Sequence, residues 1–321
     1  MSAPIVLIHY GNSSYLPYVI EIAKRFNPHK EIIFLGDEEN AYLESFGVSH
    51  YRFATSCGSP ELELFDRLYP RIVNPSYPKS RWAQFVLQRW FMINTFIHKY
   101  NIDQFWTFDS DNFILTDLQF YEEEFARYDC TSQCSGRCMN GFVSSQGIVQ
   151  RYIEKIIELL SDDNHVKHWH GLYKSDPSLF YNEMEAFAVF VEQEAVRNLP
   201  LAQIRDGRTF DDSITYENGM LMYEKTIKGR RVKKLYINDG EMYCKHLESD
   251  RLVKMDNLNL SWMPKYIFPL LFEYIVGMRV QTAFSELDLL NAPWSYHLKL
   301  FIRNRIPKPI RDQISGGTYW V

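Results

Sequence analysis

Residues 105–115 read FWTFDSDNFIL and place two carboxylates within an almost continuously apolar run. A short run of this kind is typical of a strand that is buried on both faces of a sheet. Because an uncompensated charge is costly to bury, Asp109 and Asp111 are predicted at the carboxyl end of that strand. Open α/β sheets bind their ligands at this end of their strands. The stretch therefore predicts an α/β fold with a polar site where the strand ends.

The triplet Asp109-Ser110-Asp111 has two interpretations. Since only Ser110 separates the carboxylates, both can bind one Mg²⁺ or Mn²⁺ ion, and these hard cations prefer oxygen ligands. Alternatively, the two aspartates cap a backbone turn that follows the strand. The apolar residues on both sides of the triplet favour the metal site.

Apolar runs and amphipathic segments alternate before this stretch. Strands are predicted over 5–9, 31–35 and 48–53, and helices over 15–26 and 40–46. This β-α-β-α-β order predicts a mainly parallel sheet. Residues 54–78 lose the pattern and are predicted as a surface loop. Residues 80–100 have the strongest helical periodicity in the chain and lead into the strand described above.

The chain after residue 115 mixes helices and strands. We predict a short acidic helix within 117–129, strands around 139–143, 235–237 and 242–247, helices over 146–160 and 181–198, and a basic hairpin over 225–234. The last residues, from 262 onward, are rich in aromatic and aliphatic side chains and in proline. The expected organisation is an α/β domain over 1–262 with a helical, aromatic-rich and basic extension over 263–321 packed on it.

The composition excludes several classes of protein. Hydrophobic residues make up 46% of the chain and charged residues 23%, which is typical of a globular protein. A net charge of −5 argues against nucleic acid as the main partner. The N-terminal residues lack the basic region of a signal peptide, and no apolar run approaches the ~18 residues that span a bilayer. With an odd number of cysteines, which suits a reducing compartment, these features predict a cytoplasmic protein.

Two groups of metal-binding residue types occur in the middle of the chain. Cys130, Cys134 and Cys138 recur every four residues, so they could line one face of a helix. A zinc cluster built on them would lack a CxxC pair and a clear fourth ligand. His165, His168 and His170 are predicted in a loop, either as ligands of a metal or as exposed histidines.

The order of these features resembles the GT-A glycosyltransferases, a superfamily of nucleotide-diphospho-sugar transferases. The resemblance rests on a first strand that ends in the turn 10–14, a second that ends at Gly36-Asp37, a long helix with Arg81 and Arg89, and the Asp-Ser-Asp strand. It covers residues 3–150 well and 180–262 more loosely. It implies a GT-A-like, Rossmann-like sheet, and transfer of a sugar from a UDP- or GDP-sugar to an acceptor hydroxyl on a glycan, a lipid-linked molecule or a protein.

The resemblance also implies which residues contact the donor. In the family, a Mn²⁺ or Mg²⁺ ion on the Asp-x-Asp motif stabilises the charge of the departing diphosphate. The donor-binding candidates are Tyr10, Asn12, Asp37, Arg81, Arg89, Asp109, Ser110, Asp111, Asn140 and Gly141. Arg81 and Arg89 suit phosphate recognition because of the bidentate guanidinium, although each could instead be a surface arginine paired with an acid. Asn140-Gly141 fits the turn where acceptor and donor sugar meet in many members.

Inverting members of the family need a carboxylate base that deprotonates the acceptor hydroxyl. Glu183 and Glu185 are the first candidates because they begin a predicted helix, whose N-terminus would keep such a carboxylate ionised. A capping box explains the same two residues without catalysis. Asp211 and Asp212, in a predicted loop, are further candidates.

The third metal ligand departs from the family pattern. Many metal-dependent members supply a late histidine from a segment that resembles Asn-Leu-His, whereas this chain has Asn257-Leu258-Asn259. Asn259 or Asp256 could bind the cation through oxygen, His246 could replace the histidine, or the ligand is missing.

Two other functions compete with sugar transfer. In a phosphohydrolase of the haloacid dehalogenase type, Asp109 would be the nucleophile and Asp111 the general acid. A non-catalytic sugar-binding protein would keep the fold without the chemistry. A nucleotidyltransferase is disfavoured because the first turn lacks a Gly-rich phosphate loop. The basic end, residues 299–311, could lie on an anionic membrane, or form a helix that packs on the domain with its cations in water.

Overall fold

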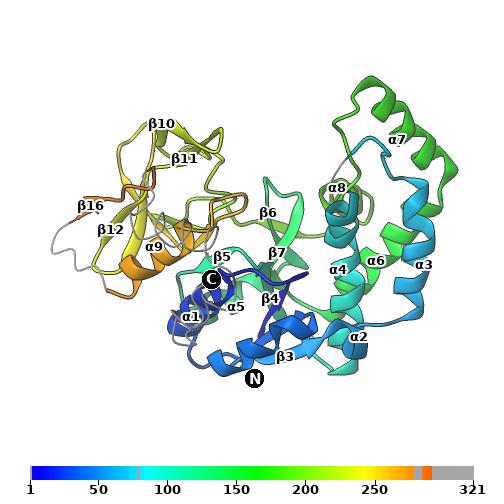
Figure 1. Ribbon diagram of the computed structural model, residues 1–321, viewed down its shortest axis with the longest axis horizontal. Coiled ribbons are helices and arrows are strands. Elements are labelled where there is room, and N and C mark those ends of the chain that lie inside the picture. The colour runs from blue at the N-terminus through cyan, green and yellow to red at the C-terminus, as the bar shows by residue number, and fades with distance from the viewer. Residues whose placement is uncertain (1, 78–79, 278–283, 291–321) are drawn as a thin grey trace, which may run out of the picture. The chain divides into compact units, whose positions relative to one another are not determined.

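The computed structural model describes residues 2–77, 80–277 and 284–290 (Figure 1). Its contacts divide the chain into two interleaved units. The first unit comprises Met1–Asn12, Asn27–Ser110 and Asp117–Ala202, and the second comprises Ser13–Phe26, Asp111–Thr116 and Gln203–Val321. The extension expected over 263–321 stays a prediction, because most of it, including the basic residues 299–311, lies outside the described residues.

A seven-stranded sheet forms the centre of the first unit. Its strands are β1 (Ile5–Ile8), β2 (Ile32–Gly36), β3 (Ser49–Arg52), β4 (Phe105–Asp109), β6 (Cys130–Gln133), β7 (Cys138–Val143) and β8 (Asn198–Pro200), in the order β3-β2-β1-β4-β7-β6-β8. Neighbours from β3 to β4 are parallel, β7 is antiparallel to β4 and β6, and β6 is parallel to β8. The expected α/β fold with a mainly parallel sheet is confirmed.

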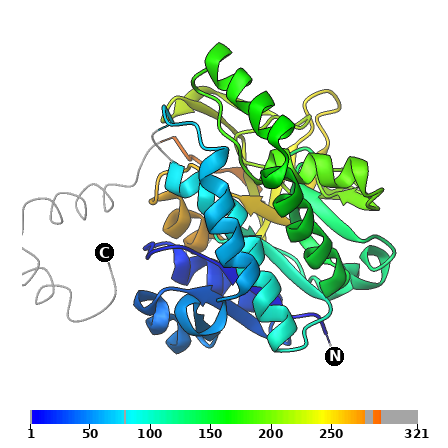
Figure 2. The ribbon, with the colours of Figure 1, turned by 90° about the vertical axis from the view of Figure 1, so that its right-hand side faces the viewer.

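Helices cover this sheet because its strands bury apolar side chains on both faces. They are α2 (Phe53–Ser56), α3 (Pro60–Leu68), α4 (Ser80–Lys99), α5 (Gln119–Phe125), α6 (Gln146–Ser161), α7 (Asp163–Ser175) and α8 (Glu183–Gln193), with the 3₁₀ helices η1 (Glu38–Phe46) and η2 (Tyr69–Arg71). Leu87 and Phe91 of α4 share a core with Val6 of β1, and α4 packs beside α3 and α6 (Figures 1 and 2). On β4, Trp106 packs against Phe125 of α5, with ring centroids 5.7 Å apart.

Two segments predicted as loops are helical. Within 54–78, α3 begins at Ser59, whose hydroxyl accepts a hydrogen bond from the Leu62 amide at 3.2 Å, and Pro60 follows in the first turn. The three histidines predicted in a loop lie on α7, where the Asp162 carboxylate accepts from the Asn164 amide at 2.8 Å. Side-chain caps begin both helices, and a few apolar residues at helical spacing hold each against the core.

The cysteine prediction was also wrong in its geometry. Cys130 lies in β6 and Cys138 in β7, while Cys134 lies in the turn between them with φ of 54°. The three residues therefore belong to a β-hairpin and do not line a helix. Within the described ranges, no group of three or more His, Cys, Asp or Glu side chains could hold a metal ion.

Gly141 lies in the middle of β7 and not in the expected turn. Its φ is +97°, and the register between β6 and β7 shifts beside it. The Thr131 hydroxyl bridges this irregularity: it donates to the Asn140 carbonyl and accepts from the Phe142 amide, each at 2.7 Å. A Cβ at position 141 would overlap this hydroxyl and the Leu201 side chain. Glycine is therefore required twice, for its backbone and for the space.

Replacing Gly141 with alanine should lower the free energy of unfolding by about 2–4 kcal/mol, combining left-handed backbone strain with overpacking. Gly136→Ala in the same hairpin is the matched control. Gly136 also has positive φ, +83°, but a Cβ there would meet nothing closer than 3.7 Å. Urea denaturation of both variants should show the larger loss for Gly141→Ala, and equal losses would contradict the steric part of this account.

The second unit contains α1 (Leu16–Phe26), α9 (Ile267–Ile275) and several small sheets. Strands β16 (Ser285–Glu286), β12 (Tyr236–Asn238), β13 (Glu241–Lys245), β14 (Leu252–Met255) and β9 (Arg208–Thr209) form a five-stranded sheet in that order. The expected basic hairpin is confirmed as β10 (Met222–Ile227) and β11 (Arg230–Lys233). β5 (Asn112–Ile114) pairs with β15 (Asn257–Asn259), and the Tyr15 ring, next to α1, stacks on Phe268 of α9 at 4.3 Å. None of the helices in the described ranges has the length and apolarity needed to cross a membrane.

Candidate functional site

The strand order reverses between β1 and β4. From β1 the chain builds outward to β2 and β3, and then returns to add β4 on the other side of β1. Ile8 of β1 is in register with Asp109 of β4, so the two strands end side by side. In open α/β sheets such a reversal leaves a crevice between the loops that follow the two strands. The sequence-predicted residues Tyr10, Asn12, Asp109 and Ser110 all lie in these loops or at their start.

The loop after β1 is held by the end of β2. The Asp37 carboxylate accepts from the Gly11 amide at 2.7 Å, and the Asn40 amide group donates to the Gly11 carbonyl at 3.2 Å. Gly11 has φ of +73° in this tight turn. Asp37, expected to contact the donor, thus fixes the shape of the first loop. The loop is also tied to the end of β4, because His9 Nδ1 lies 2.7 Å from the Ser110 hydroxyl oxygen.

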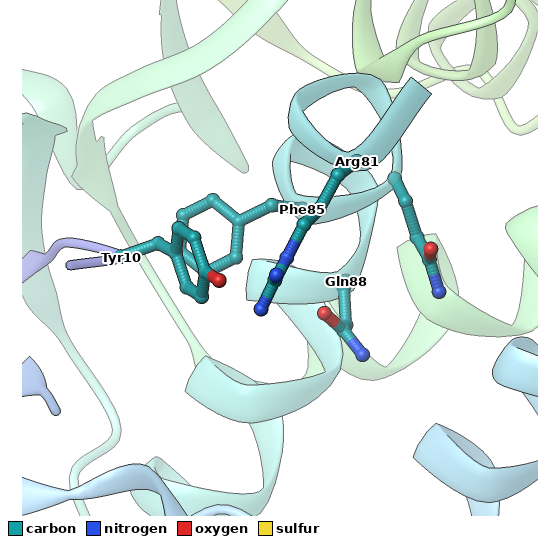
Figure 3. Close-up of a pocket in the computed structure, with 5 residues that line it drawn as sticks. Tyr10, Arg81, Phe85 and Gln88 are labelled. Carbon is teal, nitrogen blue, oxygen red and sulfur yellow. The ribbon is translucent and has the colours of Figure 1, made fainter. Parts of the chain in front are cut away.

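A surface pocket of about 230 Å³ lies against this loop (Figure 3). It is lined by Tyr10 and, from α4, by Arg81, Gln84, Phe85 and Gln88. The Arg81 guanidinium lies 4.5 Å from the centre of the Tyr10 ring, and the Phe85 ring lies 5.5 Å from that ring. Tyr10 is 43% exposed, and its aromatic ring lies next to a cation.

Sequence reasoning found Tyr10 and Arg81 but missed the rest of the pocket. The helical periodicity of residues 80–100 includes Phe85 as an apolar position, and it gives no indication of Gln84 or Gln88. The two glutamines each donate to Asp66 of α3, at 3.0 and 2.9 Å, which fixes their side chains. The spacing of 81, 84, 85 and 88 puts these residues on one helix face, and that signal could have identified them.

Arg89, which directly follows Gln88 in α4, is the centre of a buried ion-pair network. Its guanidinium donates through Nη1 to the Asp109 carboxylate and through Nη2 to the Glu183 carboxylate, the latter at 2.8 Å. The indole of Trp90 also donates to Glu183, at 3.3 Å. The side chains of Arg89 and Glu183 are 8% and 9% exposed, whereas Asp109 is 26% exposed. Arg89 therefore connects a buried acid to the carboxylate at the end of β4.

The pKa of Glu183 differs from the value that a helix N-terminus alone would favour. Burial raises the pKa of its carboxyl group to about 7, although Arg89 opposes this shift and the charge of Asp109 adds to it. The residue does begin a helix, but the N-terminal dipole is a small effect compared with the loss of water around a buried carboxylate. Asn182 provides the helix cap by accepting from the Met184 amide at 2.8 Å.

This shift predicts a pH effect on stability. Between the ordinary carboxyl pKa of 4.5 and the folded value of about 7, the native protein keeps a proton that the unfolded chain has lost. Stability from this group therefore falls as pH rises through that window. Glu183→Gln removes the effect, so its free energy of unfolding should gain up to about 3 kcal/mol relative to wild type between pH 4.5 and 7. Denaturant titrations across this range would show it, and a constant difference between the two proteins would contradict it.

The remaining predicted residues of the first unit are Glu185 in α8, Asn140 in β7 and Asn12 in the loop after β1. Glu185, two residues into α8 from Glu183, is 31% exposed and pairs with Arg137 at 2.5 Å. Asn140 is almost fully buried in β7, where its side-chain amide nitrogen has no hydrogen-bond acceptor among the residues that the structure describes. Asn12 accepts a hydrogen bond from the Tyr42 hydroxyl at 3.1 Å.

The second unit brings Asp111 together with Asn259. β5 and β15 pair with Asn112 opposite Asn259, and the Leu260 amide donates to the Asp111 carbonyl at 3.1 Å. The Ser261 hydroxyl lies 3.2 Å from Asp111 Oδ1 and 2.6 Å from Asn259 Oδ1. The Ser261 hydroxyl has one hydrogen and can donate it to one of these two oxygens at a time. Three oxygen atoms, from Asp111, Asn259 and Ser261, therefore lie close together. Sequence reasoning named Asp111 and Asn259 but missed Ser261, which a search for oxygen ligands next to Asn259 could have found.

The other candidates for the third ligand have different roles. The Asp256 carboxylate is 1% exposed and pairs with the Arg208 guanidinium. His246 Nδ1 is 3.2 Å from the Ser249 hydroxyl. Of the alternatives that the sequence left open, Asn259 is the one that the structure places at the Asp111 carboxylate.

Asp211, expected as a base, is fully buried and holds Asn259 in place. Its carboxylate pairs with Lys233 and accepts from the Asn259 amide at 3.1 Å, while its own amide donates to the Asn257 side chain. The Asn259 side-chain amide donates to the Asp212 carbonyl at 2.8 Å. Burial raises the pKa of Asp211 despite the charge of Lys233. Through these contacts, Asp211 holds Asn257 and Asn259 of β15 in position.

The comparisons with known proteins include distant likenesses to solved structures. No family model matches the sequence, and no curated protein matches it. One similar solved structure is a cytidylyltransferase from Leptospira borgpetersenii serovar Hardjo-bovis (strain JB197), at 15% identity and a TM-score of 0.32, covering 64% of this chain and 78% of that one. Another is the PaToxG glycosyltransferase, at 12% identity and a TM-score of 0.36, covering 60% and 69%. At this level the likenesses assign no family to the chain.

Proposed function

We propose that the protein is a transferase that uses a nucleotide-diphosphate sugar, and specifically a glycosyltransferase. In this proposal it moves a sugar from a UDP- or GDP-sugar to a hydroxyl of a glycan, a lipid-linked molecule or a protein. The observation that supports it most is the pocket in which Arg81 lies against the Tyr10 ring, at the strand reversal where β4 ends in Asp109. Ligands of open α/β sheets bind at such reversals.

The pocket has the chemistry that a nucleotide needs. The exposed Tyr10 ring offers an aromatic face on which a base can stack. Arg81 supplies a guanidinium, whose fork suits the oxygens of a phosphate. Gln84 and Gln88 add amide groups that can hydrogen-bond a base or a ribose. We assign this pocket to the nucleoside and Arg81 to the diphosphate of the donor.

The oxygens around Ser261 fit a divalent cation. Asp111 Oδ1, Asn259 Oδ1 and the Ser261 hydroxyl form a set of oxygen donors only, which suits Mg²⁺ or Mn²⁺. We propose that these three residues hold the cation, whereas the Asp109 carboxylate is paired with Arg89. When bound, such a cation would neutralise charge on the diphosphate as it leaves.

Acceptor activation is assigned to the start of α8. We propose Glu185 as the carboxylate that meets the acceptor, because its side chain is 31% exposed, whereas Glu183 is enclosed by Arg89 and Trp90. Glu183 then acts as the buried partner that orients Arg89. The third candidate from the sequence, Asp211, is left out because its carboxylate is buried against Lys233.

The proposal is tested by measuring hydrolysis of UDP- and GDP-sugars with Mn²⁺. Asp111→Ala should reduce turnover on the order of 100- to 1,000-fold, the usual effect of losing one group that stabilises developing charge. Ser261→Ala should weaken Mn²⁺ dependence in the same assay, and Asp250→Ala, in an exposed turn of the second unit, is the control. Phosphatase activity on small phosphoesters without sugar transfer would favour the haloacid-dehalogenase alternative. Inertness toward every donor would favour a non-catalytic sugar-binding protein.

A further inference from the structure

The hairpin between β6 and β7 holds two cysteines close together. Gln133 and Cys138 are paired across the hairpin, and the turn between them begins with Cys134. Cys134, Ser135 and Gly136 have φ values of 54°, 58° and 83°, so the turn has a defined and uncommon backbone. The Cys134 and Cys138 side chains are hydrogen-bonded to each other. Both are free thiols, Cys138 buried and Cys134 partly exposed.

The buried member of this pair also contacts the ion-pair network. The Cys138 sulfur lies 3.7 Å from Glu183 Oε1, within the range of an S–H donor to a carboxylate. The same oxygen accepts from Arg89 Nη2 at 2.8 Å. A chemical change at Cys138 therefore alters the hydrogen bonds of the carboxylate that shares Arg89 with Asp109. The other three cysteines are buried.

We propose that Cys134 and Cys138 form a reversible dithiol site that an external disulfide oxidises to an internal disulfide, with Glu183 accepting the proton of Cys138. Cys134 reacts first because it is the one that solvent reaches. The hydrogen bond with Cys134 and burial both raise the pKa of Cys138, so Cys138 keeps its proton until a base next to it removes it. Glu183 is the carboxylate in contact with that thiol.

The reaction has two steps, each a thiol–disulfide exchange. In the first, the Cys134 thiol loses its proton to water, and its sulfur bonds to one sulfur of the external disulfide, releasing the other as a thiolate. In the second, the Cys138 proton passes to Glu183, and the Cys138 sulfur attacks the Cys134 sulfur and displaces the second thiolate. Two protein thiols lose two electrons, and the external disulfide becomes two thiols once the protons reach them.

The oxidised state differs from the reduced one at a defined point. Cys138 no longer has an S–H to donate, whereas Arg89 and Trp90 still donate to the Glu183 carboxylate. The oxidation does not depend on the proposed sugar transfer. Its effect on a donor would act through Arg89 and Asp109, and that consequence rests on the proposed function.

The test uses the full chain, incubated at pH 8 with oxidised glutathione, trapped with an alkylating reagent after denaturation, and mapped by mass spectrometry. We expect a 134–138 disulfide in most molecules, with Cys57, Cys130 and Cys244 alkylated as free thiols. In Cys138→Ser, the mixed disulfide between Cys134 and glutathione should accumulate. In Cys134→Ser, Cys138 should remain a free thiol. Glutathione that remains on Cys134 in the wild type, or oxidation of Cys138 in Cys134→Ser, would overturn the proposal.

The role of Glu183 is tested by the rate of the second step. In Glu183→Gln the mixed disulfide on Cys134 should persist, with release of glutathione slower on the order of 100-fold, the usual contribution of a positioned base. Glu185→Gln is the control, because it removes a neighbouring carboxylate that pairs with Arg137. If both variants release glutathione at the wild-type rate, Glu183 is not the proton acceptor. A nucleotide-sugar assay is not needed for any of these measurements, so failure of the proposed function would be seen separately.

Discussion

Replacing Arg89 with methionine should lower the free energy of unfolding by about 3–5 kcal/mol, the range for removing one partner of a buried ion pair. Methionine keeps most of the apolar volume of the arginine stem but leaves two carboxylates without their cation. Glu183 is enclosed on all sides and Asp109 is partly so. The loss should be largest above pH 7, where Glu183 is ionised in the native protein.

The measurement is urea denaturation at pH 8, with unfolding monitored by fluorescence. Arg81→Met, on the exposed side of the same helix, is the matched control and should change stability by less than ~1 kcal/mol. The double variant Arg89→Met/Glu183→Leu should recover part of the loss, since it removes the charge left buried. A loss below about 1 kcal/mol in Arg89→Met would show that solvent reaches both acids and that the network is not buried in solution.

The second large effect is expected at Lys233, in the other unit. Its ammonium group pairs with Asp211, and the two side chains are 1% and 0% exposed. The ammonium also donates to the Ser213 carbonyl at 2.9 Å. Lys233→Met should therefore cost about 3–5 kcal/mol, because the Asp211 carboxylate is buried away from solvent and loses its cation. Since Asp211 also accepts from the Asn259 amide, the change should reach the oxygens around Ser261.

Lys234→Met is the matched control for this variant. The Lys234 side chain is 28% exposed, and its ammonium group forms a long ion pair of 3.9 Å with the Glu286 carboxylate. Its loss should therefore cost less than about 1 kcal/mol. In Lys233→Met/Asp211→Asn, the neutral amide can still accept from the Asn259 amide, and most of the stability should return. The same set can be titrated with Mn²⁺ alone. If Lys233→Met unfolds no more easily than Lys234→Met, the pair is solvated and does not hold β15.

Much of the fold follows from patterns that a local reading of the sequence contains. The apolar run at 105–109 predicts β4 correctly because a strand buried on both faces has few polar positions, and Asp109 ends it because a charge there needs a partner. The helix over 80–99 is predicted by its repeat of apolar residues. The sequence also indicates the basic hairpin, because Gly229 sits between strand-like segments.

The errors came where local capping or a single core contact decided the structure. Ser59 and Asp162 each begin a helix in a polar segment that reads as a loop, because their side chains satisfy amide groups at the helix start. Gly141 reads as a turn residue, but the bulge at Thr131 requires glycine in the middle of a strand. In each case the deciding contact is made by a side chain whose partner cannot be identified from periodicity.

The sequence by itself determined that Asp109 and Asp111 follow a buried strand in an α/β chain, because burial and charge are properties of residue types and their spacing. It did not determine what those carboxylates contact. Arg89 reaches Asp109 and Glu183 from 20 and 94 positions away in the chain. Asp111 meets Ser261 across 150 positions. Only the tertiary structure decided these pairings, because the sheet order and the β5–β15 ladder bring together residues that no local pattern connects.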